Sequence, residues 1–332
     1  MKKIIQFSLV FLAVSFLFFS CRKDGENFKV AEKYSERITQ KEVFYGHENL
    51  MISIDTDDQL RVRIYDFTNI ENPMIHYFQE IKNVFIGQIK NDRMFLLVSP
   101  SSTTVDGHLK IYDVSNLAAP VLLGELDLGD RSFEHVEFYE GNLYFVGNTG
   151  VFYHPLDENQ LEAGQILTVQ PQLLMSYELA FSPDVEQMFF SENKLILVRR
   201  VGIWIADVSN PVAPDSLAMV PIREHFTTLA ATLTNNKLCV LEDRDLFVYD
   251  FPSLDFKGEI ETDVASTMVA IDNNTLLMNG PGEFKFLDIS NPSKPKYQET
   301  ISNVGLVNYF QVIDESAFIV RELKMVKTYL IE

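Results

Sequence analysis

The feature that most constrains the fold is a short phrase that recurs along the chain. Each copy is an apolar alternation followed by Asp, then small or polar residues, then Pro. Five copies carry the aspartate, at Asp66, Asp113, Asp207, Asp250 and Asp288. Two more positions, His154 and Leu330, fit by spacing although they lack the aspartate. A phrase that returns at regular intervals indicates a fold built from similar units, here seven of them.

The spacing of the copies defines the size of the unit. Successive anchor positions are separated by 47, 41, 53, 43, 38 and 42 residues. Ahead of each anchor lie two runs of strand length around a short polar loop. In one unit we expect an inner strand at Phe133–Tyr139, a second at Leu143–Gly147 and a third at Val151–His154, and the neighbouring unit shows an outer strand at Val121–Leu126.

A unit of about 42 residues with four short strands has the size of one β-propeller blade. No helical pattern separates the strands, which excludes parallel α/β folds, and a single β-sandwich does not need seven similar copies. The sequence therefore predicts an all-β fold, a seven-bladed β-propeller of four-stranded antiparallel blades.

The two ends of the repeated region predict how the ring closes. The last unit stops at Glu332, just after its third strand, and the first inner strand begins near Glu42–Tyr45. An unpaired sheet edge is a feature that proteins avoid. We therefore expect part of Phe28–Ile38 to supply the missing outer strand, and deletion of residues 22–36 to lower the thermal stability.

The repeated aspartates have a structural interpretation. An Asp at the end of a strand, two residues before Ser or Thr, can accept backbone N–H bonds and fix a turn. The following prolines end the third strand and direct the chain to the outer edge. Repetition supports this interpretation, since an active site needs its residues once.

The phrase Asp-Val-Ser-Asn-Pro, followed by Pro and an apolar strand, resembles the LVIVD repeat family of bacterial propeller proteins. The four strong copies carry the resemblance, and weaker ones extend it over most of the chain after residue 27. The resemblance implies a propeller fold in a secreted or surface protein, and it implies no particular activity.

The first residues have the pattern of a sorting signal. Lys2 and Lys3 precede an apolar run at Ile4–Phe19, which has the length of a signal-peptide core. Ser20 and Cys21 follow, and together they resemble a lipobox, although Phe18 and Phe19 replace the usual residue types. We expect a lipoprotein signal peptide at 1–20, a lipidated tether at 21–27 and the propeller at 28–332.

The residues that follow Cys21 indicate where the protein is localised. No Asp follows the cysteine, and the charged stretch there is similar to the surface-export signals of Bacteroidetes lipoproteins. We therefore expect a protein that Cys21 anchors to the outer membrane, at the cell surface or facing the periplasm. The other cysteine, Cys239, lies in an apolar run and is expected to be a buried, inert thiol.

Charge narrows the choice of partners. Two of the 28 Lys and Arg residues and none of the 47 Asp and Glu residues fall in the first 20, which leaves the rest with a net charge of −21. Such a charge argues against nucleic acid and against electrostatic docking on anionic lipid. We expect a monomer that binds a protein or glycan of the cell envelope and that carries no cofactor.

By analogy with other propellers, binding is expected on the face that presents the hairpins between second and third strands and the connections between blades. The candidate binding residues on this face are Asp57, Asp58, Asp130, Arg131, Glu134, His135, Arg199, Arg200, Glu224, His225, Asp243, Arg244 and Asp245. No catalytic or metal-binding residue is assigned among them.

Two alternatives to a binding module remain open. His135 and His225 each follow a glutamate ahead of an inner strand, so they could meet at the mouth of the channel in a glycan lyase or hydrolase. The chain lacks a nucleophile elbow, a phosphate loop and paired metal-ligand spacings. The other alternative is an assembly factor of an outer-membrane complex.

One unit is irregular. The third gap is 53 residues long, and its excess is expected around Pro171–Asp184, a segment rich in Leu, Met, Tyr and Phe. It is either a lid or docking loop over the channel, or an insertion packed on its own blade.

Overall fold

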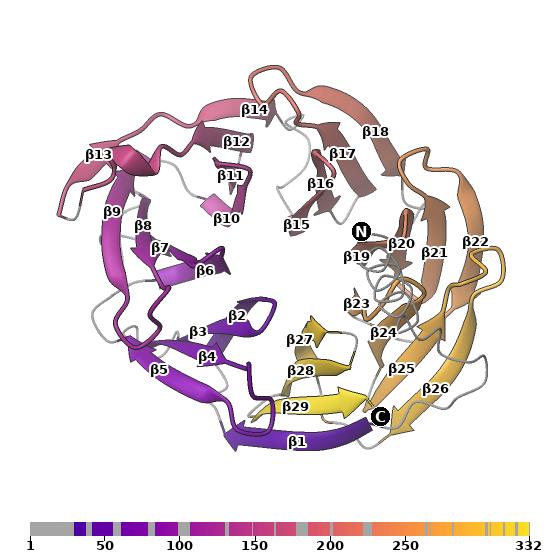
Figure 1. The fold of residues 1–332 in the computed structure, drawn as a ribbon. Helices are drawn as coiled ribbons and strands as arrows, with labels where there is room; N and C mark the ends of the chain where they lie inside the picture. The colour runs from indigo at the N-terminus through magenta and orange to yellow at the C-terminus, as the bar shows by residue number, and fades with distance from the viewer. Residues whose placement is uncertain are drawn as a thin grey trace, which may run out of the picture.

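The structure of the chain, a computed structural model, describes residues 30–37, 42–55, 61–78, 84–98, 107–129, 133–147, 149–162, 164–176, 185–199, 202–221, 228–262, 265, 267–280, 282–302, 305, 307–314, 316–322 and 325–331. These ranges contain 29 β-strands and one short 3-10 helix. The strands form seven sheets, six of four strands and one of five, arranged in a ring (Figure 1). The prediction of a seven-bladed propeller is confirmed.

The first three blades follow one another along the chain. Blade 1 contains β2 (Glu42–His47), β3 (Leu50–Asp55), β4 (Arg61–Asp66) and β5 (Met74–Phe78). Blade 2 contains β6 (Val84–Lys90), β7 (Arg93–Val98), β8 (His108–Asp113) and β9 (Val121–Asp127). Blade 3 contains β10 (Phe133–Tyr139), β11 (Asn142–Gly147), β12 (Gly150–Pro155) and β14 (Gln172–Ser176).

The remaining blades complete the circle. Blade 4 contains β15 (Val185–Ser191), β16 (Lys194–Arg199), β17 (Gly202–Asp207) and β18 (Asp215–Pro221). Blade 5 contains β19 (Thr228–Thr234), β20 (Lys237–Glu242), β21 (Asp245–Asp250) and β22 (Phe256–Glu261). Blade 6 contains β23 (Met268–Ala270), β24 (Thr275–Gly280), β25 (Glu283–Asp288) and β26 (Lys296–Ser302). Blade 7 contains β27 (Val307–Asp314), β28 (Ala317–Glu322), β29 (Met325–Ile331) and β1 (Val30–Arg37).

The second strand of each blade reads as an apolar run because it is covered on both sides. Met51 of β3 packs with Ile319 and Val326 of blade 7, whereas the next residue, Ile52, packs with Met94 of blade 2. Successive side chains of a strand point to opposite faces of the sheet, so each must meet a different neighbouring blade. The hydrophobic core is therefore distributed over the junctions between blades.

The ring closes through the N-terminal strand, as predicted. β1 pairs antiparallel with β29, from Val30 opposite Ile331 to Arg37 opposite Met325. At the same junction the Thr328 hydroxyl donates to the Ile70 carbonyl at 2.7 Å. A strand from one end of the chain thus completes the sheet formed by the other end.

Blade 3 corrects the expectation for the long unit. Its additional residues precede Pro171, and they form the 3-10 helix η1 (Glu158–Gln160) and β13 (Ile166–Thr168). β13 pairs parallel with β9, so the insertion packs on blade 2 and not on its own blade. The Gln172–Ser176 part of the predicted segment is the outer strand β14, and residues 177–184 lie outside the described residues.

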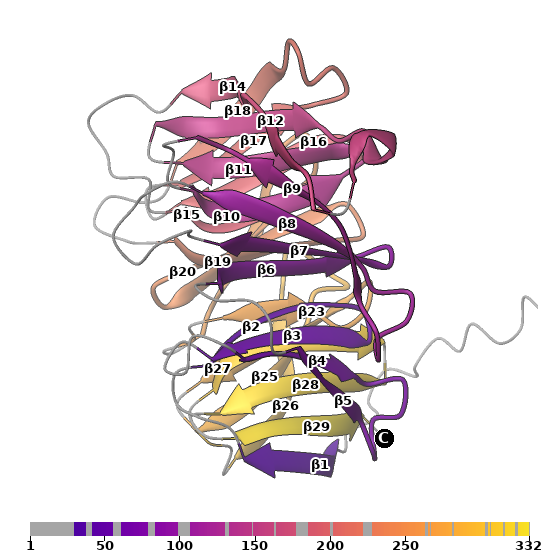
Figure 2. The ribbon, with the colours of Figure 1, turned by 90° about the vertical axis from the view of Figure 1, so that its left-hand side faces the viewer.

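The strands run between two faces of the ring, which Figure 2 shows from the side. No helix in the described part of the chain combines the length and the apolar character needed to cross a membrane.

Candidate functional site

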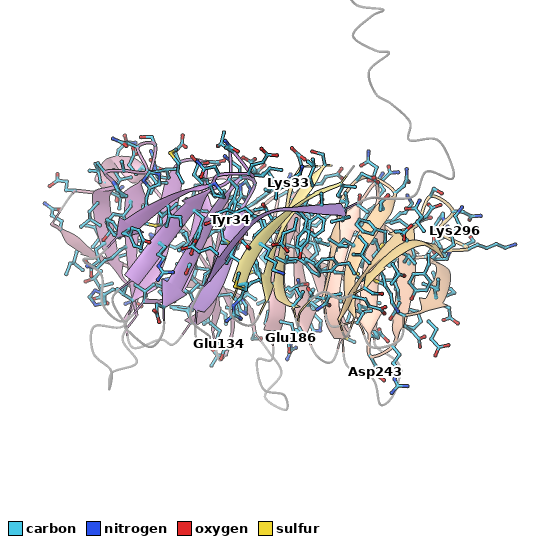
Figure 3. All side chains as sticks on the ribbon, turned by 90° about the horizontal axis from the view of Figure 1, so that it is seen from below. Lys33, Tyr34, Glu134, Glu186, Asp243 and Lys296 are labelled. Atoms are coloured by element: carbon cyan, nitrogen blue, oxygen red, sulfur yellow. The ribbon has the colours of Figure 1, made fainter. Side chains whose placement is uncertain are left out.

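The connections between strands divide the molecule into two faces. One, the Asx-turn face, carries the hairpins between first and second strands and the turns between third and fourth strands. The other, the loop face, carries the hairpins between second and third strands and the connections between blades. Figure 3 labels Glu134, Glu186 and Asp243 along the edge that belongs to the loop face.

On the Asx-turn face the repeated aspartates hold their own turns. Four of them accept a hydrogen bond from the backbone N–H two residues later, at 2.7–2.8 Å: Asp66 from Thr68, Asp113 from Ser115, Asp207 from Ser209 and Asp288 from Ser290. The structural role predicted for these four residues is confirmed. Asp250 differs, because its carboxylate pairs with Lys257 at 2.5 Å and the chain turns through a cis Phe251–Pro252 bond.

The Asp207 carboxylate shows the electrostatic consequence of such a turn. Its hydrogen bonds to Lys194, the Ser209 hydroxyl and the Ser209 backbone N–H lower its pKa well below the usual range. A carboxylate held ionised by donors on its own turn and by a lysine of the neighbouring strand is suited to fixing the backbone and poorly suited to proton transfer.

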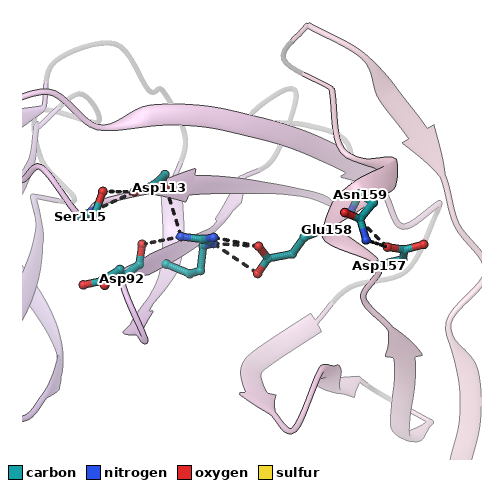
Figure 4. Close-up of polar contacts among 7 residues, drawn as sticks. Asp92, Asp113, Ser115, Asp157, Glu158 and Asn159 are labelled. Carbon is teal, nitrogen blue, oxygen red and sulfur yellow. Dashed lines mark hydrogen bonds and ion pairs between the residues drawn. The ribbon is translucent and has the colours of Figure 1, made fainter.

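Blade 2 adds a salt-bridge network on this face (Figure 4). Arg93 contacts the Asp113 carboxylate at 3.3 Å and holds Glu158 of η1 through Nη2 at 2.8 Å and Nε at 3.1–3.2 Å. Asp157 caps the same 3-10 turn by accepting the Asn159 backbone N–H at 3.1 Å. The network ties the insertion of blade 3 to blade 2 and leaves the repeated turn in place.

On the loop face the structure describes six of the candidate binding residues. Glu134, Asp243 and Arg244 are exposed, Asp245 and His135 are partly buried, and Arg199 is buried. Asp57, Asp58, Asp130, Arg131, Arg200, Glu224 and His225 lie outside the described residues, as does the lipidation residue Cys21.

His135 connects two blades. Its Nε2 atom lies 2.9 Å from the backbone carbonyl oxygen of Val185, at the start of β15, so this nitrogen carries the proton and donates. Burial lowers the pKa of the imidazole, which keeps the ring neutral near pH 7. One ring nitrogen of His135 is therefore used to hold blade 3 against blade 4.

Arg199 is placed differently from the expectation of an exposed binding residue. It is 3% exposed, and its guanidinium lies 5.0 Å from the centre of the Trp204 ring. Asp55 and Glu242 occupy the same position, the sixth residue of a second strand, and are 5% and 2% exposed. The charged side chains at this position in blades 1, 4 and 5 are thus buried, and Asp55 and Glu242 share the register of Arg199.

The neighbour of His135 on the next blade was not predicted. Glu186 is the second residue of β15, as Glu134 is the second residue of β10, and both side chains are exposed. Both carboxylates act on the His135 imidazole, where they oppose the effect of burial on its pKa. The described part of the loop face at blades 3 and 4 thus presents two carboxylates beside a neutral imidazole.

Metal and thiol chemistry find no support in the described part of the chain. No group of three His, Cys, Asp or Glu side chains there is arranged to hold a metal ion. Cys239 is fully buried, and burial raises the pKa of its thiol to about 12. The prediction that this thiol is buried is confirmed.

A comparison with protein families identifies the repeat. The model of the LVIVD repeat matches residues 104–127 and 280–302. The chain carries LVIVD repeats. Each match spans a third strand, the Asx turn and a fourth strand, which are β8 and β9 in blade 2 and β25 and β26 in blade 6. No curated protein matches the chain.

Proposed function

We propose that this protein is a lipid-anchored binding module of the cell envelope that presents its loop face to a protein or glycan partner. The chain binds without catalysing a reaction, and Cys21 attaches it to the outer membrane in the manner of Bacteroidetes surface lipoproteins. Its large negative charge favours a neutral or basic partner surface.

The observation that carries the proposal is the direction of β1. Val30, its first residue, pairs with Ile331 at the end of β29, which is the Asx-turn end of blade 7. The nine residues from Cys21 to Lys29 precede it, and an extended chain of that length reaches about 30 Å. A lipid on Cys21 would therefore hold the ring by the Asx-turn end of blade 7, and the loop face would be the face further from the attachment.

The chemistry of the two faces agrees with this assignment. On the Asx-turn face the aspartates are occupied by hydrogen bonds within their own turns. On the loop face the exposed charges differ in sign between blades, as Glu134 of blade 3 and Arg244 of blade 5 illustrate. Surfaces that bind a specific partner need such unequal patterns, because an evenly repeated surface presents the same contacts seven times.

Crosslinking within one blade tests the proposal. Asp243 and Ser253 are both exposed in blade 5, on the loop face and the Asx-turn face respectively. Full-length Asp243→Cys and Ser253→Cys would each be labelled with a benzophenone maleimide and illuminated in intact cell envelopes. Cys239 is fully buried and does not compete for the reagent.

We expect a defined crosslinked species from position 243 and none from position 253. Mass spectrometry of that species would also separate the forms of the proposal, since an outer-membrane barrel partner indicates an assembly factor and a glycan indicates a surface receptor. Equal crosslinking from both positions, or crosslinking from 253 alone, would contradict the choice of face.

A further inference from the structure

A lysine and a glutamate form an ion pair near the axis of the ring, away from the loop face. The Lys90 Nζ atom lies 3.3 Å from Oε1 of Glu137. Lys90 is on β6 and Glu137 is on β10, the first strands of blades 2 and 3, and the first strands lie nearest the axis (Figure 1). Lys90 is the last residue of β6, beside the hairpin that leads to β7. The pair therefore lies toward the Asx-turn face.

The register shows that the two side chains meet on the side of β10 that faces the axis. Val136 and Phe138 pack in the core between blades 2 and 3, so Glu137, which alternates with them, lies on the other face of the blade 3 sheet. Since β11 occupies the outer edge of β10, Lys90 of blade 2 reaches Glu137 around the free inner edge. Gln88 lies at this edge too, because its Oε1 atom accepts the Phe138 backbone N–H at 2.8 Å.

The inner ends of blades 1, 2 and 3 place several nitrogen atoms around this one carboxylate. The Lys90 and Glu137 side chains are 20% and 22% exposed, so solvent reaches the pair. The Gln88 side chain also hydrogen-bonds the Glu137 carboxylate. On β2 of blade 1, burial lowers the pKa of the His47 imidazole, Glu48 opposes this effect and Lys90 adds to it. Lys90 thus acts on groups of both neighbouring blades.

A second lysine–carboxylate pair has similar exposure and different electrostatics. Lys194 and Asp207, both in blade 4, are 20% and 25% exposed. Hydrogen bonds from Lys194 and from its own turn lower the pKa of Asp207, so this carboxylate stays ionised. Burial raises the pKa of the Glu137 carboxyl, although Lys90 opposes the rise. Glu137 is therefore the carboxylate that takes up a proton more readily.

Protonation of Glu137 would change the charge balance at Lys90. Among the described residues, Lys90 is the one charged group that shifts the pKa of the Glu137 carboxyl. An ammonium that loses its counter-charge in a partly buried place is costly, and an anion from solution can restore the balance. The other titratable side chains on the strands and hairpins around the pair are Tyr45, His47, Glu48, Asp92, Glu134, His135, Tyr139, Glu140, Tyr144 and Glu186.

We propose that Lys90 and Glu137 form a binding site for a small carboxylate ligand. The donors there already surround a carboxylate, so a second carboxylate fits beside Glu137 once that residue holds a proton. The ligand accepts one hydrogen bond from the Lys90 ammonium and one from the protonated Glu137 carboxyl, which are charge-assisted bonds. Where Glu137 is ionised beforehand, binding transfers one proton from solution to its carboxylate, and no covalent bond forms. The site is separate from the loop face and does not depend on a partner there.

Isothermal titration of the full-length chain with acetate tests the site, at constant ionic strength and between about pH 5.5 and pH 8. Inorganic phosphate and chloride are the comparison anions. The variants are Lys90→Met and Glu137→Gln, and the matched control is Lys194→Met, which removes a lysine of equal exposure. Thermal unfolding followed by circular dichroism shows whether each variant is folded.

We expect acetate to bind the native chain more tightly as the pH falls, by up to about tenfold per pH unit, because each ligand is bound together with one proton. Glu137→Gln should bind acetate with an affinity that does not depend on pH, since its amide N–H replaces the acid O–H. Lys90→Met should weaken binding by about tenfold or more. Lys194→Met should bind as the native chain does. Titrations in buffers of different ionisation enthalpy count the proton.

Three results would overturn the proposal. Equal binding by the native chain and Lys90→Met, or equal weakening in Lys194→Met, would show a general attraction of anions to the surface. Tighter binding of phosphate or chloride than of acetate would contradict a carboxylate site. A folded Glu137→Gln that binds no acetate would identify the pair as a structural contact between blades 2 and 3, and this variant decides the question if Lys90→Met does not fold.

Discussion

The two faces of the ring differ in how far they repeat. On the Asx-turn face, four blades make the same hydrogen bond from an aspartate to the backbone two residues later. On the loop face, the last residue of the second strand is Asp55, Arg199 and Glu242 in three blades and Val98 and Gly147 in two others. Repetition marks a turn that four blades share, and variation marks the face where blades can serve different contacts.

Removing β1 should have the largest effect, because this strand closes the ring by completing the sheet of blade 7. Deletion of residues 22–36 removes most of the seven residue pairs that β1 makes with β29. At about 1 kcal/mol for each hydrogen bond lost, we expect the free energy of unfolding to fall by about 5 kcal/mol. Differential scanning calorimetry of the chain from residue 22 and of the deletion variant measures this.

The control is a chain that begins at residue 28, because it lacks the residues before β1 and leaves β1 whole. An unchanged melting temperature after deletion of residues 22–36 would show that pairing of β1 with β29 does not stabilise the ring. The two faces would then have to be compared in a ring that is stable without closure by β1.

The next largest effect is expected where a blade meets the Asx turn of its neighbour. A Cβ atom at Gly258 of β22 would lie 2.4 Å from the Pro292 carbonyl oxygen and 3.0 Å from the Ser293 backbone. Since backbone cannot move aside as a side chain does, Gly258→Ala should lower the free energy of unfolding by about 2–4 kcal/mol. Urea denaturation provides the measurement.

Gly87→Ala is a graded control for this clash. Its Cβ would lie 3.3 Å from the ends of the Ile54 and Leu96 side chains, which can rotate, so the loss should be smaller than at Gly258. Equal losses at the two positions would show that the Asx turn of blade 6 is not a rigid partner of blade 5.

A single Asx turn should contribute less than a junction. Asp207→Ala removes the bond to the Ser209 backbone and the pairing with Lys194, and we expect it to lower the free energy of unfolding by less than Gly258→Ala does. Asp250→Ala, at the one aspartate with a different turn, should lower it less again, because an exposed ion pair such as that with Lys257 contributes little. If the two substitutions lowered the free energy of unfolding equally, the repeated turn geometry would not be what makes Asp207 stabilising. Chemical denaturation of both variants at pH 7 decides between them.

The repeated features of the fold were the ones that the sequence predicted. The strand at Phe133–Tyr139 followed from local alternation, and the closing strand followed from counting the sheets. The insertion of blade 3 was misplaced because β13 has three residues, too few to show a period, and its partner β9 is far away in sequence. Arg199 was expected on the surface because the sequence does not tell which sixth-position side chains are buried. That depends on the neighbouring blade.

The smallest effect we predict concerns the loop face and its response to pH. Burial lowers the pKa of His135 in the folded state, so the unfolded chain binds the proton first as the pH falls below about 6.5. The stabilisation present at pH 7 is therefore lost progressively as the pH falls from about 6.5 toward the lower folded pKa. His135→Gln keeps a side-chain N–H for the Val185 carbonyl but cannot titrate, and at pH 7 it should cost about 1 kcal/mol or less. Unfolding measured between pH 7 and 5 should show a smaller decline for His135→Gln than for the native chain. If the free energy of unfolding fell equally for both proteins, protonation of His135 would not destabilise the junction of blades 3 and 4. The non-repeating loop face would then add no pH dependence of its own between pH 7 and 5.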